Sequence, residues 1–542
     1  MMPLRPTYAG SGLVDAIATK TGAIMTVTTL HLPRRGFMAG LCATAGEVAL
    51  LPKSSIADEA PTYRNATDLV QALASRQISA RDLLDATIKR IEALDPKINA
   101  VVVRDFDRAR AAADAADAAL ARGDRRLLLG LPMTVKEQFS VAGLPTTWGH
   151  TEYRDWRPDT DALAVQRLKA AGAIIIGKTN VPVNLADWQS YNDVYGTTNN
   201  PWDFGRTPGG SSGGSAAALA AGFVPLELGS DIGGSLRAPA HFCGVFSHKP
   251  SLDLIPQRGS GPPETPAIAG RSELAVIGPM ARSAADLALE LNVLAGPDEM
   301  WDGIGYKLAL PEPRHDNLAD FRVLVIDTHP LCPTAASIEG VLEQLIGRLA
   351  KVGCKVMRAS AKMPDLAQTT RNYDELLSAS FSVATPPDER ARIEAAAMAL
   401  SPDDLSLRAA SLRGATMSHV AWVRTSSIRN GLRSRWQALF QEVDVIVCPP
   451  MPTTAFPHDH SPRVTRQLDV DGKKVRYFDQ VVWAAVATTS GLPASVIPIA
   501  QDNNGLPIGV QIIGGYLEDR TTIAFGGLME REFGGFKPPP SL

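Results

Sequence analysis

The chain contains little cysteine, few aromatic residues and almost no excess of charge: its 542 residues include five cysteines, 6% aromatic residues and a formal net charge of −3. Five cysteines are too few for a disulfide-built scaffold. A balanced charge is unlike the basic excess of nucleic-acid-binding proteins. No run reaches the roughly 18 to 20 uninterrupted apolar residues that a membrane-spanning helix needs. Because 45% of the residues are hydrophobic, we expect a large globular chain with no nucleic-acid partner and no membrane span.

The amino terminus resembles an export signal of the twin-arginine type. Arg34 and Arg35 precede a mildly apolar run at 39–51, and small residues lead up to Ala57. We predict cleavage near Ala57 and a periplasmic or secreted protein, so residues 1–57 are set apart from a domain at 58–542. Met25 is an alternative start that puts the arginine pair at a usual distance from the terminus. A basic tail without a targeting role, on a cytoplasmic protein, is the other interpretation.

The cysteines and histidines do not form a metal-ligand pattern. Cys243, Cys332, Cys354 and Cys448 follow the predicted signal, and none belongs to a CxxC or Cys/His spacing. We expect buried free thiols, with a bridge between Cys332 and Cys354 left open. His458 and His460 form an HxH in a proline-rich loop, which is more typical of solvated side chains, so we predict no metal site.

Short apolar segments alternate with amphipathic helical patterns from residue 67 onward. Helices are indicated at 67–73, after Ser79, at 105–121 and at 161–170, and a long loop at 252–270. Strands are indicated at 133–135, 173–176, 224–228, 322–326, 355–358, 443–448, 494–498 and 509–513. This alternation predicts an α/β fold, a single large α/β/α sandwich around a mixed, mostly parallel twisted sheet.

Two familiar motifs occur in contexts that argue against them. Residues 172–179 match the P-loop pattern GxxxxGK[ST], but their Ala-Ile-Ile-Ile run is typical of a buried strand rather than of a loop that cradles phosphate. We therefore expect no nucleotide binding. Residues 210–214 match GxSxG, with Ser212 as the nucleophile of an α/β-hydrolase. That interpretation needs a downstream histidine such as His419, and by itself the motif is weak.

A third pattern accounts for more residues at once. Residues 209–215, Gly-Gly-Ser-Ser-Gly-Gly-Ser, run into an alanine-rich helix, and residues 228–239 contain a second glycine turn, Asp-Ile-Gly-Gly-Ser-Leu-Arg. Glycines there let the backbone approach a ligand closely. Upstream, Lys136 follows an apolar strand, which can hold its amine in a partly dry site. The chain resembles the amidase signature family of serine hydrolases, over about residues 65–530, with Glu137, Ser230 and Ser247 as mild departures.

The resemblance implies the catalytic residues. Ser235 is the expected nucleophile, Ser211 the bridging serine on a cis peptide, and Lys136 the terminal base. The backbone NH groups of Ile232, Gly233 and Gly234 are expected to form the oxyanion hole. Supporting roles are expected for Ser212, which hydrogen-bonds within the site, and for Asp231 and Arg237, which pair to hold the turn.

The proposed base sets a physical requirement. A serine hydroxyl becomes a good nucleophile only when a base removes its proton, and a neutral lysine can do so through a second hydroxyl. The pKa of Lys136 must therefore fall from about 10.4 toward 7, which burial can achieve. No histidine and no cofactor are needed.

The substrate is the least determined part of the sequence-based prediction. Trp148, Trp188 and Tyr191 precede the first serine and are candidates for the substrate pocket, although ordinary core aromatics would look the same. We expect a small aryl or alkyl amide, with some ester hydrolysis. Three alternatives stay open: the A-type component of a glutamyl-tRNA amidotransferase, a carboxylesterase that uses Ser212, and an inactive binding protein on the same scaffold. A homodimer is also left open.

The export prediction is testable directly. Changing Arg34 and Arg35 together to lysine keeps the charge but removes the paired guanidinium groups, and should abolish export while leaving the protein in the cytoplasm. Fractionation of cells, with a Lys53→Arg variant as control, measures the outcome. Unaltered export of the double variant would contradict a twin-arginine signal.

Overall fold

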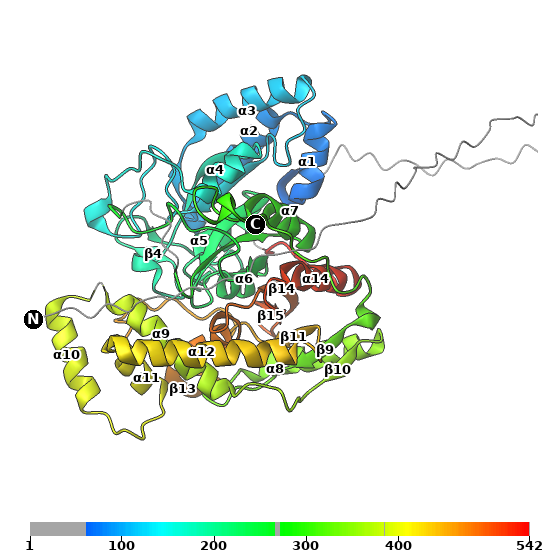
Figure 1. The fold of residues 1–542 in the computed structure, drawn as a ribbon. Helices are drawn as coiled ribbons and strands as arrows, with labels where there is room; N and C mark the ends of the chain where they lie inside the picture. The colour runs from blue at the N-terminus through cyan, green and yellow to red at the C-terminus, as the bar shows by residue number, and fades with distance from the viewer. Residues whose placement is uncertain (1–60, 266–271, 384, 541) are drawn as a thin grey trace, which may run out of the picture. The chain divides into compact units, whose positions relative to one another are not determined.

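The structure is a computed structural model that describes residues 61–265, 272–383, 385–540 and 542. Its central feature is one large sheet (Figure 1). Its strands are β1 (Val101–Arg104), β2 (Pro132–Lys136), β3 (Ile174–Thr179), β6 (Leu226–Asp231), β7 (Phe246–Lys249), β8 (Val276–Ala281), β9 (Arg322–Val325), β10 (Lys355–Met357), β11 (Val445–Cys448), β14 (Ala494–Gln501) and β15 (Pro507–Ile513). Two small hairpins lie outside it, β4 (Tyr191–Asn192) with β5 (Gly196–Thr197), and β12 (Gln467–Val470) with β13 (Lys473–Arg476). The predicted signal at 1–57 lies outside the described residues.

The order of strands across the sheet is β1-β3-β2-β6-β8-β7-β14-β15-β11-β9-β10. Parallel pairs occur in two groups, β3-β2-β6 and β11-β9-β10. All other neighbours in this sheet are antiparallel. The mixed α/β sheet is confirmed, but our expectation of a mostly parallel sheet was wrong, because β7, β8, β14 and β15 place an antiparallel block between the two parallel groups.

The α-helices divide between the two halves of the sheet. The helices are α1 (Ala66–Ala74), α2 (Ala80–Ile98), α3 (Phe106–Ala121), α4 (Leu163–Ala170), α5 (Gly213–Ala220), α6 (Arg237–Cys243), α7 (Ala284–Leu294), α8 (Ala336–Lys351), α9 (Leu366–Ser382), α10 (Pro387–Met398), α11 (Leu407–Ala415), α12 (His419–Leu439), α13 (Val482–Thr488) and α14 (Asp519–Phe533). Figure 1 shows α1 to α4 and α7 in the upper part and α8 to α12 in the lower part, with α6 and α14 between them. None of the described helices is long and apolar enough to cross a bilayer.

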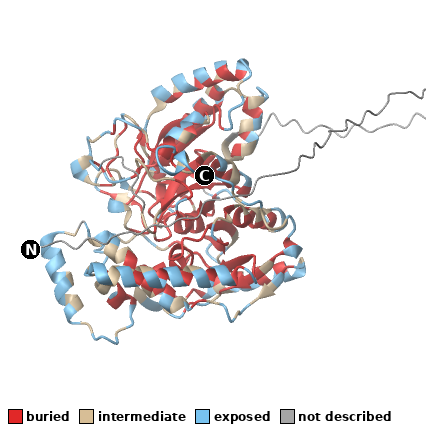
Figure 2. Ribbon diagram, in the orientation of Figure 1, coloured by how far each residue is buried: buried red, intermediate tan, exposed pale blue. Residues whose placement is uncertain are grey.

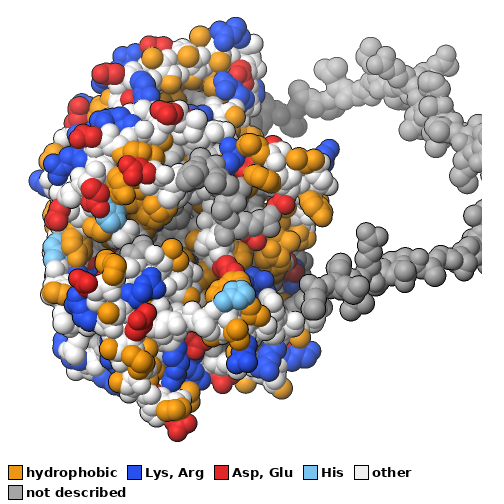
Figure 3. All heavy atoms as spheres, turned by 60° about the vertical axis from the view of Figure 1, so that its left-hand side comes forward, with side chains coloured by type: hydrophobic (Ala, Val, Ile, Leu, Met, Phe, Trp, Pro, Cys, Tyr) orange, Lys and Arg blue, Asp and Glu red, His pale blue; other side chains and the backbone are white. Residues whose placement is uncertain are grey.

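Burial is concentrated around the sheet, and the outer faces of the helices are exposed (Figure 2). α10 does not contribute to this buried region, because none of its residues is buried. On the face shown in Figure 3, acidic and basic side chains are intermixed. Cys243, Cys332, Cys354 and Cys448 are buried free thiols, as predicted, and the bridge between Cys332 and Cys354 is not formed.

Most of the helices and strands predicted from local sequence signals are present in the structure. Ser79 caps α2, since its hydroxyl accepts a hydrogen bond from the Asp82 amide at 3.0 Å. Each predicted strand overlaps an observed strand, with ends that differ by a few residues. The segment after Gly172 is the fully buried strand β3 and not a phosphate-binding loop. Its Lys178 donates hydrogen bonds to the Pro145 carbonyl and the Thr146 hydroxyl, both at 2.6 Å.

Two central strands carried no clear signal. β7 reads Phe-Ser-His-Lys, with three polar residues that are completely buried. β8 contains a glycine and a proline, which normally argue against a central strand. These strands are specified by tertiary contacts, and local preference for a strand is weak in both.

The sheet also buries an acidic side chain beside the predicted site. Glu227 of β6 accepts a hydrogen bond from the Thr134 hydroxyl of β2, and both residues are inaccessible to solvent. Burial raises the pKa of Glu227 to about 8. This carboxyl group is therefore protonated at neutral pH in the folded protein.

Glu227 should make stability depend on pH. In the unfolded chain the carboxyl ionises above about 4.5, whereas the folded protein keeps the proton until about 8, so the free energy of unfolding falls as pH rises between these values. Glu227→Gln cannot ionise and should lose this part of the decrease. Urea unfolding at pH 5 and pH 8 gives the comparison, and an equal decrease in wild type and variant would contradict a neutral Glu227.

Candidate active site

Two glycine-rich turns meet at the end of β2 and β6. The first contains the Gly210–Ser211 peptide, which is cis, and leads into α5. The second joins β6 to α6 and contains Gly234, whose φ of +94° favours glycine. Gly210 is equally constrained, since a Cβ there would lie 2.4 Å from the Asp187 carbonyl oxygen. Only glycine allows the first turn to pack this closely against the backbone at Asp187.

Lys136 is the last residue of β2 and is completely buried. Its Nζ is within hydrogen-bond distance of two hydroxyl oxygens, that of Ser211 at 2.7 Å and that of Ser230 at 2.9 Å. Burial lowers the pKa of this amine to about 7, although the charge of Asp231 acts in the opposite direction. A substantial fraction of Lys136 is therefore uncharged near neutral pH, which is the condition for it to accept a proton.

Ser235 lies on the neighbouring turn, 6% exposed. Its carbonyl oxygen accepts a hydrogen bond from the Ser212 amide at 3.2 Å, which ties the two turns together. Within the described part of the chain, no hydrogen bond engages the Ser235 hydroxyl. The structure thus joins Lys136 directly to Ser211 and brings Ser235 next to the same turn, while the contact between the hydroxyls of Ser211 and Ser235 stays a prediction.

Asp231 and Arg237 form the predicted pair, and both side chains are buried. The guanidinium bonds both carboxylate oxygens, at 3.0 and 2.8 Å. Burial by itself would raise the pKa of Asp231, but the charge of Arg237 lowers it to about 2. Arg237 also reaches Thr488 and Gln511, at 2.8 and 2.7 Å, so the pair connects the turn to α13 and β15.

The predicted oxyanion turn requires one correction. The Gly234 NH donates to Asp231 Oδ1 at 2.9 Å, so this group is already engaged and is not the free donor that we expected. The carbonyl of Ile232 accepts from the Tyr373 hydroxyl at 2.7 Å, and that of Gly233 from the Trp188 indole NH at 2.9 Å. These bonds fix the peptide planes of the turn, and the Ile232 and Gly233 NH groups stay the predicted donors.

The three aromatic residues predicted to line the pocket have different environments. Trp188 contacts the oxyanion turn through the bond just described. The Trp148 indole NH donates to the Gln138 carbonyl at 3.2 Å, close to the lysine. Tyr191 stacks on His460, with ring centroids 3.9 Å apart, and its hydroxyl accepts from Arg466. The bonds and ring contacts of Tyr191 therefore do not involve Ser235 or the residues of its turn.

Sequence reasoning missed three side chains of this region. Tyr373 comes from α9, in the poorly recognisable second half of the chain. Ser230 was noted only as a departure from the family pattern, yet it contacts Lys136. Gln138 accepts a hydrogen bond from Ser230. No local pattern singles out Tyr373, whereas the position of Gln138, two residues after the lysine, could have suggested its proximity.

The histidine-based alternatives find no support in the geometry. The Ser212 hydroxyl donates to the Ser230 carbonyl at 3.3 Å, and no described histidine bonds to it. His248 does lie between Ser495 and Asp519, at 2.9 and 3.0 Å, but all three side chains are fully buried and closed to a substrate. No cluster of three or more His, Cys, Asp or Glu among the described residues could hold a metal ion.

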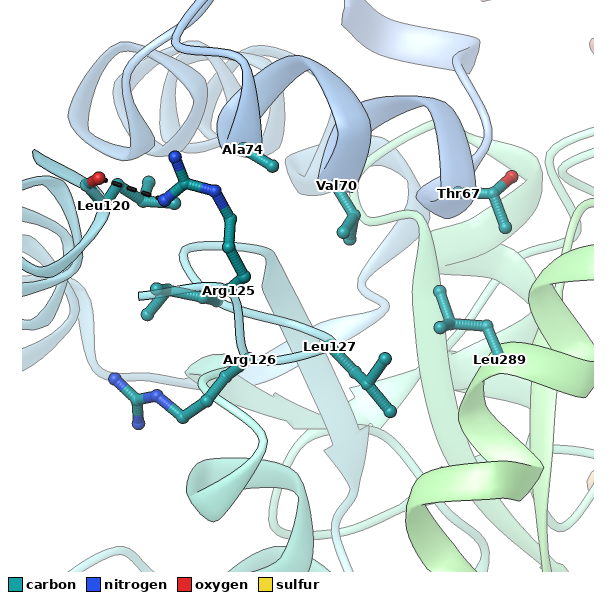
Figure 4. Close-up of a pocket in the computed structure, with 9 residues that line it drawn as sticks. Thr67, Val70, Ala74, Leu120, Arg125, Arg126, Leu127 and Leu289 are labelled. Atoms are coloured by element: carbon teal, nitrogen blue, oxygen red, sulfur yellow. Dashed lines mark hydrogen bonds between the residues drawn. The ribbon is translucent and has the colours of Figure 1, made fainter. Parts of the chain in front are cut away.

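A separate pocket of about 190 Å³ lies between α1, the chain after α3, and α7 (Figure 4). Its walls are mainly apolar, with arginines at one side. The lining residues are Thr67, Val70, Ala74, Leu120, Arg125, Arg126, Leu127, Leu129 and Leu289. None of the predicted site residues contributes to it, so it is distinct from the site around Lys136.

Comparison with known proteins identifies the class to which this fold and site belong. The family model described as Amidase matches residues 82–523. The chain therefore belongs to the amidase family, which confirms the resemblance to amidase signature enzymes.

Several relatives match most of this chain over nearly their own whole length. The A-type component of the glutamyl-tRNA(Gln) amidotransferase of Roseiflexus castenholzii is 33% identical over 478 residues, which are 85% of this chain and 94% of the relative. A Mycobacterium tuberculosis protein that carries the name amidase AmiB2 is 35% identical over 477 residues, which are 86% and 96%.

Solved structures share the fold. One, from a protein complex described as revealing the origins of an s-triazine catabolic enzyme, aligns with a TM-score of 0.73 and 28% identity over 86% of this chain and 98% of the other. A bacterial aryl acylamidase aligns with a TM-score of 0.72 over 88% and 97%, at 22% identity, and shows the fold alone.

The buried ion pair should dominate the stability of the site. Asp231→Ala leaves Arg237 charged, buried and unpaired, which we expect to cost about 3 to 5 kcal/mol of unfolding free energy. The exposed pair between Arg81 and Asp85 offers a matched control, since Asp85→Ala should leave the unfolding midpoint almost unchanged. Urea unfolding followed by circular dichroism measures both, and similar midpoints for the two variants would contradict the role given to Asp231.

Proposed function

We propose that the protein hydrolyses the C–N bond of a carboxylic amide through an acyl-enzyme on Ser235. The observation that carries the proposal is the contact of Lys136, buried and with its pKa lowered to about 7, with the Ser211 hydroxyl, on the turn that adjoins Ser235. A lysine in this state can accept a proton, which a solvated lysine at neutral pH cannot.

The proposed steps conserve protons. Ser235 passes its proton to Ser211 as its oxygen attacks the amide carbon, and Ser211 passes its own proton to the free electron pair of Lys136. The Ile232 and Gly233 NH groups stabilise the oxyanion of the tetrahedral intermediate. The proton on Lys136 then passes through Ser211 to the departing amine as the C–N bond breaks. Water attacks the acyl carbon and gives a proton through Ser211 to Lys136, and this proton returns to the Ser235 oxygen as the acid leaves.

The surroundings of the turn favour an apolar substrate. Trp188, Tyr373, Met451 and Ala484 belong to one buried hydrophobic cluster, against which Ile232 packs. A Cβ on Gly234 would lie 3.4 Å from Ala484 and 3.7 Å from the Trp188 nitrogen, so the turn is bordered by apolar and aromatic groups. We therefore propose an aryl or alkyl amide, with esters as slower or secondary substrates.

A second candidate function is that of an amidotransferase component. It is favoured by the relatives named as the A-type component of glutamyl-tRNA(Gln) amidotransferase, which match over nearly their whole length. Under this alternative the chain would act with partner proteins and take glutamine as its amide. Turnover of anilides by the isolated chain, without release of ammonia from glutamine, supports the free amidase. The reverse pattern would favour the amidotransferase, and binding without turnover would favour an inactive scaffold.

The catalytic assignment predicts a specific set of losses. Ser235→Ala, Ser211→Ala and Lys136→Ala should each lower kcat/KM for an anilide by about 10³-fold or more, because these residues act as a unit. Ser495→Ala, which removes the serine of the buried histidine cluster, should retain labelling of the nucleophile by a fluorophosphonate. Mass spectrometry of the labelled peptide should locate the adduct on Ser235. An adduct on Ser212, or normal turnover by Lys136→Ala, would refute the assignment.

The pH profile tests the same base independently. Since only the neutral amine of Lys136 accepts a proton, kcat/KM should rise with pH through an apparent pKa near 7. Rates of anilide hydrolysis between pH 5 and 9 measure this limb. A profile that is flat across this range would contradict a lysine base with a lowered pKa.

A further inference from the structure

The second hydrogen bond of Lys136 has a defined direction. Nζ lies 2.9 Å from the Ser230 hydroxyl oxygen, and that hydroxyl donates to the side-chain oxygen of Gln138. A serine hydroxyl has one proton, so a hydroxyl that donates to Gln138 can only accept from Lys136. Gln138 therefore determines which partner donates in the contact between Ser230 and Lys136.

This direction matters because a neutral amine has two protons and a single lone pair. If Ser230 were free to rotate, its hydroxyl could donate to that lone pair and compete with Ser211 for it. Because the proton of Ser230 is held by Gln138, Lys136 gives one of its own protons to Ser230 instead. The lone pair is then left for the proton that arrives through Ser211.

We propose that Gln138 orients the hydrogen bonds around Lys136, acting through Ser230, so that the lone pair of the neutral amine faces Ser211. The inference rests on the proposed function and adds a positioning residue to it. Gln138 does not touch the reacting hydroxyls in this arrangement.

The surroundings of Gln138 suit such a role. It lies two residues beyond Lys136 and is 5% exposed. Its backbone carbonyl accepts from the Trp148 indole, and the preceding Glu137 accepts from the Trp148 amide at 3.0 Å. These bonds fix the Gln138 backbone to the segment at Trp148, and the Gln138 side chain is held by its bond from Ser230. A Cβ on Gly229, the residue before Ser230, would lie 2.6 Å from Leu236, so the backbone that carries Ser230 is closely packed as well.

A double-mutant cycle tests the inference. Gln138→Leu keeps the size of the side chain but cannot accept the Ser230 proton. It should lower the acylation rate constant by about 10- to 100-fold with little change in KM, a partial loss of the roughly 10²- to 10⁴-fold contribution of general-base catalysis. Ser230→Ala removes the competing hydroxyl together with one acceptor, so it should itself be slower than wild type. The decisive variant combines the two, because Gln138→Leu should have almost no further effect when Ser230 is alanine.

The outcomes separate cleanly. Equal rates for Ser230→Ala and the double variant support orientation through Ser230, whereas losses that multiply would overturn it, as would a normal rate for Gln138→Leu. Gln257→Leu is the matched control, a partly buried glutamine that donates to the Ala275 carbonyl at 2.7 Å, and it should retain the wild-type rate. If Gln138→Leu does not fold, as judged by circular dichroism, the same cycle is measured with Gln138→Ala.

The cycle also distinguishes this inference from the proposed function. Acylation is followed by release of the amine from an anilide, and separately the nucleophile is phosphonylated with a fluorophosphonate and the adduct is located by mass spectrometry in each variant. Absence of an adduct on Ser235 in the wild-type protein would refute the proposed mechanism itself. An adduct on Ser235 together with multiplicative losses would refute only the role of Gln138.

Discussion

The chemistry proposed for this protein depends on one buried amine. Lys136 has no exposure to water, and its two hydrogen-bond partners are the hydroxyls of Ser211 and Ser230. Burial removes the hydration that normally favours the ammonium ion, which is why the pKa falls to about 7. Asp231 opposes this effect, but its charge is already matched by Arg237. The ion pair thus stabilises the turn without restoring the positive charge of the lysine.

The sheet brings these groups together. β2 and β6 are parallel neighbours, with Val135 opposite Leu228, so Lys136 and Ser230 lie near the carboxyl ends of their strands, at the same edge of the sheet. The two glycine-rich turns meet there through the bond from the Ser212 amide to the Ser235 carbonyl, and Gly209 lies against the Pro239 backbone of α6, where a Cβ would come within 2.7 Å. Side chains distant in sequence complete the site, since Tyr373 and Trp188 fix the carbonyls of Ile232 and Gly233. The turn between β6 and α6 is therefore stabilised by side chains from outside its own segment of chain.

Much of this arrangement could be predicted from the sequence, and the failures have physical causes. The apolar strand that ends at Lys136 and the strand around Leu228 are short apolar runs, and the Gly-Ser turns are specific enough to identify the family and to predict the site residues. The antiparallel block was missed because β7 buries polar side chains and β8 contains proline. The engagement of the Gly234 NH by Asp231, and the chain from Lys136 through Ser230 to Gln138, depend on side-chain geometry that spacing alone does not determine.

The protonation state of Lys136 in the free enzyme is the most direct test of this account. Lysine labelled with ¹³C at the ε-carbon reports ionisation through its chemical shift, and comparison with Lys136→Met assigns the signal. We predict a titration midpoint near 7 for Lys136. A midpoint near the ordinary lysine value of 10.5 would mean that the amine is charged at neutral pH, and would contradict its role as the base.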